Sequence, residues 1–187
     1  MNRTYDLVLE SVCAALITIC SWISLTVMEI PFTLQTFGIL LVLYTIGGRR
    51  GTIAILVYIL LGVIGVPVFA GFKSGPAAVM GPTGGFIIGF VIAGFVYWLT
   101  DSRWLGKYKN KASSRMLISI IEGIIFEIIL YVFGVIWFIM IYTRNTGAIG
   151  LGSVLAMCVV PFIIPDIVKL LAAAAASLRL AGIVKQR

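Results

Sequence analysis

Two oppositely charged residues, Asp166 and Lys169, lie in an otherwise apolar segment near the C-terminus. Their spacing of three residues places both side chains on one face of a helix. Each would cost about 2.5 to 3.5 kcal/mol at the centre of a lipid-facing helix, so both must point into protein or a polar cavity. They either form a buried ion pair that only fixes helix packing, or present an acceptor and a donor to a polar ligand.

Two further carboxylates, Glu122 and Glu127, lie in a second apolar segment. Five residues on a helix are about 140° apart, so the two side chains do not share one narrow face as a catalytic carboxylate pair would. We expect Glu127 to lie deeper and face inward, and Glu122 to reach the cytoplasmic interface. Neither is assigned a catalytic role.

The residue types that are absent exclude other chemistry. The chain has no histidine, which rules out His-based metal sites and Ser-His or Cys-His nucleophile pairs. Its three cysteines lie in apolar runs without a CxxC pair, and no glycine-rich phosphate loop occurs. We therefore predict no catalytic residue, metal site or cofactor in this chain, and energy from hydrolysis would require a partner.

Composition places the chain in a membrane. Of 187 residues, 61% are apolar and 11% charged, and the mean hydropathy is +1.14. Soluble domains are about 45 to 50% apolar and about 25% charged. One crossing takes about 20 apolar residues, which leaves room for about six crossings and no sizeable soluble domain. We expect one all-α integral membrane domain over residues 1–187.

Charge-free runs predict the helices of a six-transmembrane-helix bundle, the first of them retained and not cleaved as a signal peptide. The expected ranges are about 7–28, 36–48, 51–66, 84–100, 116–143 and 153–182. Residues 48–51 alone separate the second helix from the third, which predicts a tight hairpin. Pro161 and Pro165 predict a kink or a partly unwound start in the sixth helix.

Basic residues predict the orientation. With six spans, eleven of the fourteen Lys and Arg residues fall on the side that carries both termini. Only Lys73 and Arg144 fall on the other side, and Lys169 lies within a span. The positive-inside rule therefore places both termini in the cytoplasm, N-in and C-in. It also explains the net charge of +7 without a nucleic-acid partner.

The connection between the third and fourth helices, residues 67–85, is rich in glycine and proline. Such a segment is not expected to form a regular helix, and unpaired backbone at membrane depth needs protein or a water-filled cavity around it. We expect it to cap a cavity open to the outside; the alternative is an ordinary solvated loop.

Small residues at four-residue spacing predict close helix packing. One stripe runs along the fourth helix, and the first helix offers two pairs, Ser11 with Ala15 and Ala14 with Thr18. These stripes indicate either contacts within the bundle or a docking site for another subunit.

Four segments in order resemble the BioY family, the biotin-specific S component of bacterial energy-coupling factor (ECF) transporters. They are residues 31–36 (PFTLQT), residues 65–72 (GVPVFAGF), residues 81–86 (GPTGGF) with Gly89 and Phe90, and Pro165-Asp166-x-x-Lys169. The resemblance covers essentially the whole chain.

The resemblance implies a non-enzymatic subunit of the bacterial cell membrane that captures biotin in an outward-facing cavity and topples to deliver it. The implied partners are membrane lipid, a transmembrane coupling subunit and two ATP-binding subunits, which would use the ATP. The family's alanine-based docking motif on the first helix falls on Ser11, Ala14, Ala15 and Thr18, where this sequence departs from it.

The resemblance also implies a set of ligand contacts. Asp166 suits the two ureido N–H groups of biotin, and Lys169 suits either the ureido carbonyl or the carboxylate. The other expected contacts are hydrogen bonds from Gln35 and Thr36, aromatic walls or a lid from Phe32, Phe69 and Phe72, attraction of the carboxylate by Lys73, and the paired glycines Gly84 and Gly85.

Three alternatives remain at this stage. An S component for another small vitamin or a nucleobase-like solute would share the bundle and its partners. A small integral-membrane enzyme would have to use Glu122, Glu127 and Asp166. A purely structural subunit would need neither a charged pair nor a gated loop.

Overall fold

The computed structural model describes residues 3–25, 30–101 and 112–184, and these ranges are mostly helical. The helices are α1 (Arg3–Trp22), α2 (Gln35–Ile46), α3 (Gly48–Val63), α4 (Pro76–Met80), α5 (Gly84–Thr100), α6 (Ala112–Thr146), α7 (Leu151–Cys158) and α8 (Val160–Val184). A short antiparallel hairpin, β1 (Ser24–Leu25) with β2 (Phe32–Thr33), follows α1, and a 3-10 turn (Ala70–Phe72) precedes α4.

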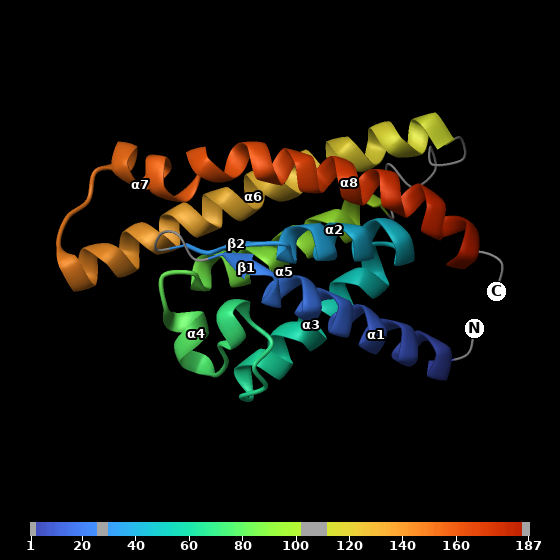
Figure 1. Cartoon of the computed structure of the whole chain (residues 1–187), viewed down its shortest axis with the longest axis horizontal. Helices are drawn as coiled ribbons and strands as arrows, with labels where there is room; N and C mark the ends of the chain where they lie inside the picture. Colours follow the sequence, from blue (N-terminus) through green and yellow to red (C-terminus); the bar gives the residue numbers. More distant parts are fainter. Residues whose placement is uncertain (1–2, 26–29, 102–111, 185–187) are drawn as a thin grey trace.

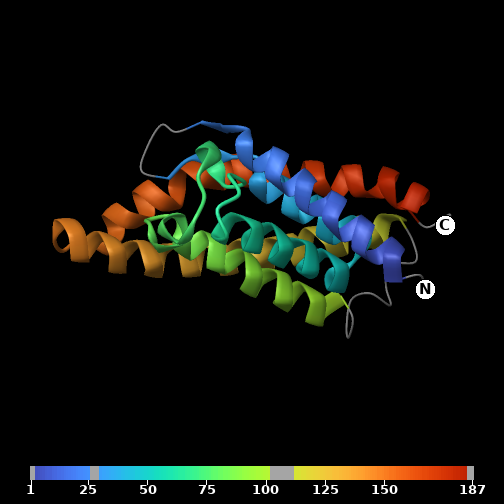
Figure 2. The ribbon, with the colours of Figure 1, turned by 90° about the horizontal axis from the view of Figure 1, so that it is seen from below.

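The helices lie along one long axis (Figure 1). The two longest, α6 and α8, run in opposite directions along one side, and α1 and α3 lie on the other (Figures 1 and 2). The most extensive packing joins α5 to α6 and α2 to α8. The start of α1 and the end of α8 share one end of the molecule, which we call the basic end; α4 and α7 lie at the other end, the loop end.

Three stretches of the described chain are long and apolar enough to cross a membrane: Arg3–Trp22, Ser114–Asn145 and Leu151–Leu180. The chain is a membrane protein. In contrast, the 12 residues of α2 cover only about 18 Å at about 1.5 Å each, less than the roughly 30 Å of a hydrocarbon core. The N-terminus of α2 therefore lies inside the bundle, where its side chains line a cavity.

Each of the six predicted ranges contains a helix, but several boundaries were wrong. The first helix ends at Trp22 and not at residue 28, because the chain turns into β1; residues 26–29 lie outside the described ranges. A single residue, Gly47, separates α2 from α3, and Arg49 and Arg50 belong to α3. The φ of Gly47, 87°, is in the left-handed region that glycine adopts readily.

The predicted kink before Asp166 is confirmed, with a correction to its place. The break falls at Val159, whose φ of −124° and ψ of −59° end α7. Pro161 lies in the first turn of α8, where a missing N–H costs little, and Pro165 lies inside that helix. Asp166 is therefore in regular helix and not in an unwound segment.

The glycine- and proline-rich connection contains one short helix, α4, which the sequence did not predict. Pro76 occupies the first position of α4, where proline's fixed φ suits a helix start. The loop is thus partly helical and is held against the ends of α1 and α3.

The small-residue stripe of α5 forms contacts within the bundle. Gly85 packs directly on the Trp137 side chain and the Phe133 carbonyl of α6, and Gly89 packs on Leu130. Ala93 is fully buried on the same face. The close approach of α5 to α6 accounts for this stripe without a second subunit.

We predict that Gly85→Ala destabilises the protein, because a Cβ atom at this position would collide with the α6 backbone and with Trp137. Overpacking of this kind costs about 1 to 3 kcal/mol, so the melting temperature in detergent should fall. Gly152→Ala on α7, where the new Cβ meets nothing within 4 Å, is the control and should melt like the wild type. Equal melting temperatures for both variants would contradict this packing.

Candidate functional site

A cavity opens among β2, the N-terminus of α2, the α3–α5 connection, α5, α6, α7 and α8. The volume accessible to the centre of a water molecule is about 80 Å³, enough for several waters. Its polar lining residues are Thr33, Gln35, Thr36, Lys73, Thr83, Tyr131, Asp166 and Lys169. Its apolar walls include Ile30, Phe69, Phe86, Phe90, Leu130 and Phe162. Apolar walls with a few convergent polar groups are typical of a small-molecule site.

Asp166 and Lys169 form an ion pair in this cavity, with Lys169 Nζ 2.7 Å from Asp166 Oδ1. Tyr131 donates a hydrogen bond of 2.6 Å from Oη to Asp166 Oδ2. Only 7% of the Asp166 side chain and 11% of the Lys169 side chain are exposed. Both Asp166 oxygens are therefore engaged by groups that line the same cavity.

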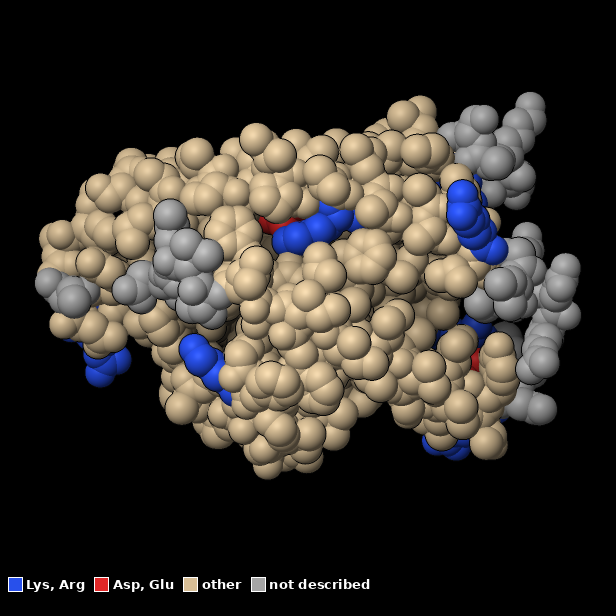
Figure 3. All heavy atoms as spheres, in the orientation of Figure 1, with Lys and Arg blue, Asp and Glu red and all other residues tan. Residues whose placement is uncertain are grey.

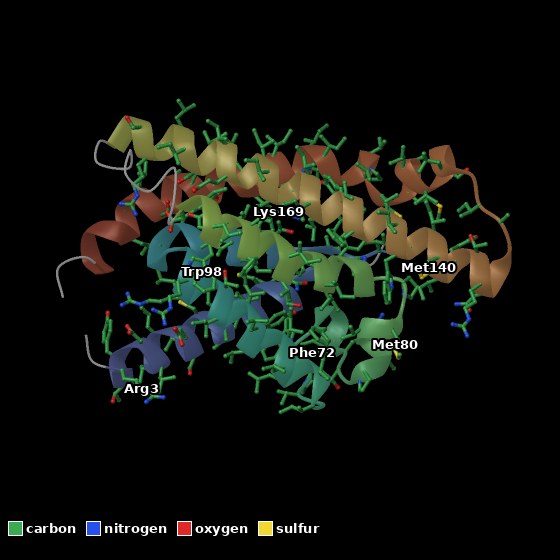
Figure 4. The ribbon with its side chains drawn as sticks, turned by 180° about the vertical axis from the view of Figure 1, so that it is seen from behind. Arg3, Phe72, Met80, Trp98, Met140 and Lys169 are labelled. Carbon is green, nitrogen blue, oxygen red and sulfur yellow. The ribbon has the colours of Figure 1, made fainter. Side chains whose placement is uncertain are left out.

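The pair lies far from both ends of the molecule. Figure 4 labels Lys169 near the middle, with Arg3 and Met140 towards opposite ends. On the face shown in Figure 3, the uncharged middle is interrupted at one recessed place where basic and acidic atoms meet. Since charge at membrane depth is costly, the sequence predicts that both side chains point into protein or a polar cavity, and their buried positions agree with that prediction.

The start of α2 forms another part of the cavity wall. Gln35 Nε2 donates to Tyr58 Oη over 3.0 Å, and Tyr58 Oη donates to Ser21 Oγ over 3.2 Å. The Gln35 backbone N–H donates to Thr33 Oγ1. Gln35 and Thr36 are both buried and line the cavity with Asp166 and Lys169. This chain of hydrogen bonds fixes the Gln35 amide against α1 and α3.

The α3–α5 connection covers one side of the cavity. Trp22 Nε1 of α1 donates to the Pro67 carbonyl over 2.8 Å, and the Gly75 N–H donates to the Gly62 carbonyl over 2.7 Å. Phe69 is buried and lines the cavity, while Lys73 is exposed at its rim. The loop thus places one ring inside and one cation at the mouth.

Four of the expected binding residues do not line the cavity. Phe72 is 60% exposed and its ring packs against Trp22, 5.1 Å away; Figure 4 shows it with the loop and Met80, away from Lys169. Phe32 stacks behind the lining ring of Phe162, at 4.2 Å. Gly84 and Gly85 face the Val79 carbonyl and Trp137, so their lack of a side chain serves helix packing.

Several cavity residues were missed by the sequence analysis. Tyr131 follows Glu127 by four residues and so shares its helix face, a signal that was available from the spacing. Thr83 lies in the family segment 81–86 but was not singled out there. The ring of Phe162 carried no comparable signal, because aromatic residues are frequent in apolar segments.

The four residues predicted for subunit docking separate into two pairs. Ala14 and Thr18 are buried within the bundle, and the Thr18 hydroxyl donates to the Ala14 carbonyl over 2.9 Å. Ser11 and Ala15 lie on the exposed face of α1. Only the second pair is free to contact another subunit in this conformation, since Ala14 and Thr18 already pack against the bundle.

Glu122 and Glu127 are both buried, with 2% and 8% of their surface exposed. The inward position predicted for Glu127 is confirmed. Glu122 packs inside the bundle near Tyr44 and Tyr97, so its side chain is not on the surface, and its place at the cytoplasmic interface stays a prediction.

Comparison with known proteins gives consistent matches. The BioY family model matches residues 1–186. The biotin transporter BioY of Thermotoga maritima is 34% identical, over 94% of this chain and 95% of that protein. The probable biotin transporter BioY of Pyrococcus horikoshii is also 34% identical, over 96% and 98%. The crystal structure at 2.1 Å of the S-component for biotin from an ECF-type ABC transporter matches with a TM-score of 0.77 and 24% identity, covering 96% of this chain and 94% of that one. This last match shows a shared fold.

Proposed function

This chain belongs to the BioY family, and from that premise we propose that it binds biotin and takes it up as the substrate-binding S component of an ECF-type transporter. Its role is transport and not catalysis. The observation that carries the proposal is the cavity that holds Asp166, Lys169 and Gln35 together beneath the α3–α5 connection.

Biotin's chemistry fits this cavity. Its ureido ring has two N–H donors and one carbonyl acceptor, its thiophane ring and valeryl chain are apolar, and its tail is a carboxylate. Asp166 supplies an acceptor and Lys169 a cationic donor, while Phe69, Phe86 and Phe90 supply apolar walls. Lys73 at the rim is placed to attract the carboxylate.

We propose a multi-pass arrangement in the bacterial cell membrane with both termini in the cytoplasm. The start of α1 and the end of α8 share the basic end (Figure 1). The α2–α3 junction lies beside the end of α5, since the Gly48 N–H donates to Asp101 Oδ2 over 3.0 Å. Most of the basic loop at 101–115 lies outside the described residues. The positive-inside rule puts this end in the cytoplasm and the cavity mouth outside.

The proposed partners are a transmembrane coupling subunit and two ATP-binding subunits. The chain itself has no phosphate-binding loop, so ATP would be used by those subunits. The exposed side of α1, with Ser11 and Ala15 among Val8, Val12 and Ile19, offers an apolar surface with small residues for the coupling subunit.

The test is to purify the protein in detergent and identify any retained ligand by mass spectrometry. We expect biotin to copurify and unlabelled biotin to displace labelled biotin. Riboflavin, thiamine and a nucleobase should not compete at a hundredfold excess. Copurification of a different vitamin, or displacement by one, would replace biotin as the proposed ligand while leaving the fold and family unchanged.

A further inference from the structure

Glu127 of α6 is a buried carboxyl group next to the proposed site. Only 8% of it is exposed, and among the described residues neither carboxyl oxygen has a hydrogen-bond partner. The next turn of α6 places Leu130 and Tyr131 in the cavity wall. Glu127 therefore lies about one turn below the cavity lining, towards the basic end. A buried, unsatisfied carboxyl costs free energy and calls for an explanation.

The charged and titratable groups that face Glu127 come from three helices. Asp166 and Lys169 of α8 interact with it electrostatically, as do Tyr131 of its own helix and Tyr44 of α2. The Tyr44 hydroxyl lies against Gly123, one turn from Glu127, and also has no hydrogen-bond partner among the described residues. Beyond Tyr44, towards the basic end, lie Glu122 and Tyr97.

Lys169 is thus the only ammonium among these neighbours, and it faces two carboxyl groups. When Asp166 and Glu127 are both ionised, the cluster has a net charge of −1, and both anions compete for one cation. When Glu127 carries a proton, the cluster is neutral and Asp166 alone balances Lys169. A ligand that carries a carboxylate and a carbonyl acceptor is repelled by the first state and accepted by the second, because charges in a poorly solvated site interact strongly.

We propose that Glu127 links ligand affinity to proton binding: the site accepts biotin when the Glu127 carboxyl carries a proton, and ligand binding draws a proton from solvent onto that carboxyl where it is ionised. The step forms one O–H bond on Glu127 and takes the proton from water or buffer. Glu127 acts as a positioning residue, because it governs how fully Lys169 is available without touching the ligand. The proposal rests on biotin as the ligand.

The test measures biotin affinity from pH 6.5 to 9 in the purified wild type, in Glu127→Gln and in the control Glu122→Gln. Biotin's own carboxyl group titrates well below this range, and a free lysine titrates near pH 10.4. We expect the wild-type Kd to rise at least fivefold across the range. Glu127→Gln, which fixes the neutral form, should keep the neutral-pH affinity within threefold and lose the slope. Glu122→Gln should keep the slope.

Calorimetry on the wild type in two buffers of different ionisation enthalpy gives a second readout that needs no variant. We expect net proton uptake on biotin binding at pH 8. No uptake, a flat wild-type profile, or an unchanged slope in Glu127→Gln would overturn the proton link while leaving biotin binding intact. Absence of biotin binding at every pH would instead refute the proposed function, and the proton link with it.

Discussion

Lys169→Ala and Asp166→Asn are each expected to weaken biotin binding at least tenfold, about 1.4 kcal/mol. The Lys169 ammonium lies 2.7 Å from Asp166 Oδ1, and the Tyr131 hydroxyl donates a hydrogen bond to Asp166 Oδ2. These contacts hold all three groups on one side of the cavity. Removal of Lys169 deletes the cationic donor of this group. The asparagine variant replaces one carboxylate oxygen by an amide nitrogen, which donates and cannot accept from a ureido N–H. Titration of the purified variants with labelled biotin measures both effects.

The double variant Asp166→Asn/Lys169→Ala separates ligand binding from a purely structural ion pair. Each single substitution strands a buried partner, which is destabilising, so each should lower the melting temperature. The double variant carries neither charge and should recover much of that loss. If the pair binds ligand, affinity stays low in the double variant. The pair would be assigned to helix packing alone if the affinity of the double variant recovered together with its melting temperature. The same conclusion would follow if both single variants bound biotin with unchanged affinity.

The sequence predicted the helices and the charged pair well, for the same physical reason. Apolar runs of helical length have few alternatives in a membrane, and a charge within such a run has to face protein or water. Asp166 and Lys169 were therefore found without knowledge of the fold. Gln35 and Thr36 were found by family resemblance, and the structure places both in the same cavity wall.

The direction of loop side chains could not be predicted in the same way. Whether Phe69 or Phe72 faces inward depends on how the loop is tied to α1, through a hydrogen bond between Trp22 and Pro67, 45 residues apart. Both residues carry the same side chain, so composition does not distinguish them. The turn at Gly71, with φ of 67°, sends one ring inward and the other onto Trp22.

Glycine in a family segment posed a similar ambiguity. Because glycine has no side chain, it lets the backbone come close either to a ligand or to a neighbouring helix, and the residue type does not tell which. At Gly84 and Gly85 the second use applies, since the space next to each is filled by Val79 or Trp137. Likewise, four-residue spacing on α1 identified two small-residue pairs but not which of them faces the bundle.

Ala15→Trp is expected to reduce biotin uptake at least tenfold in cells that also make the coupling and ATP-binding subunits. Ser11 and Ala15 are the small residues on the exposed face of α1, and small residues let two membrane helices approach closely. An indole at Ala15 would hold the partner helix away, and copurification of the coupling subunit should fall with uptake. Biotin binding by the purified variant should stay within twofold of the wild type, since Ala15 does not line the cavity.

Ile128→Trp on α6 is the matched control for this docking face. Ile128 is 57% exposed on a long apolar helix, so the indole would face lipid and both uptake and copurification should be retained. Full uptake by Ala15→Trp would place the docking face elsewhere on the bundle. A loss of biotin binding in that variant would show instead that α1 acts on the cavity, through the contact of Trp22 with the loop that carries Phe69. The two variants therefore separate subunit docking from ligand capture, since Ser11 and Ala15 lie in the middle of α1 and the contact with the loop is made by Trp22 at its end.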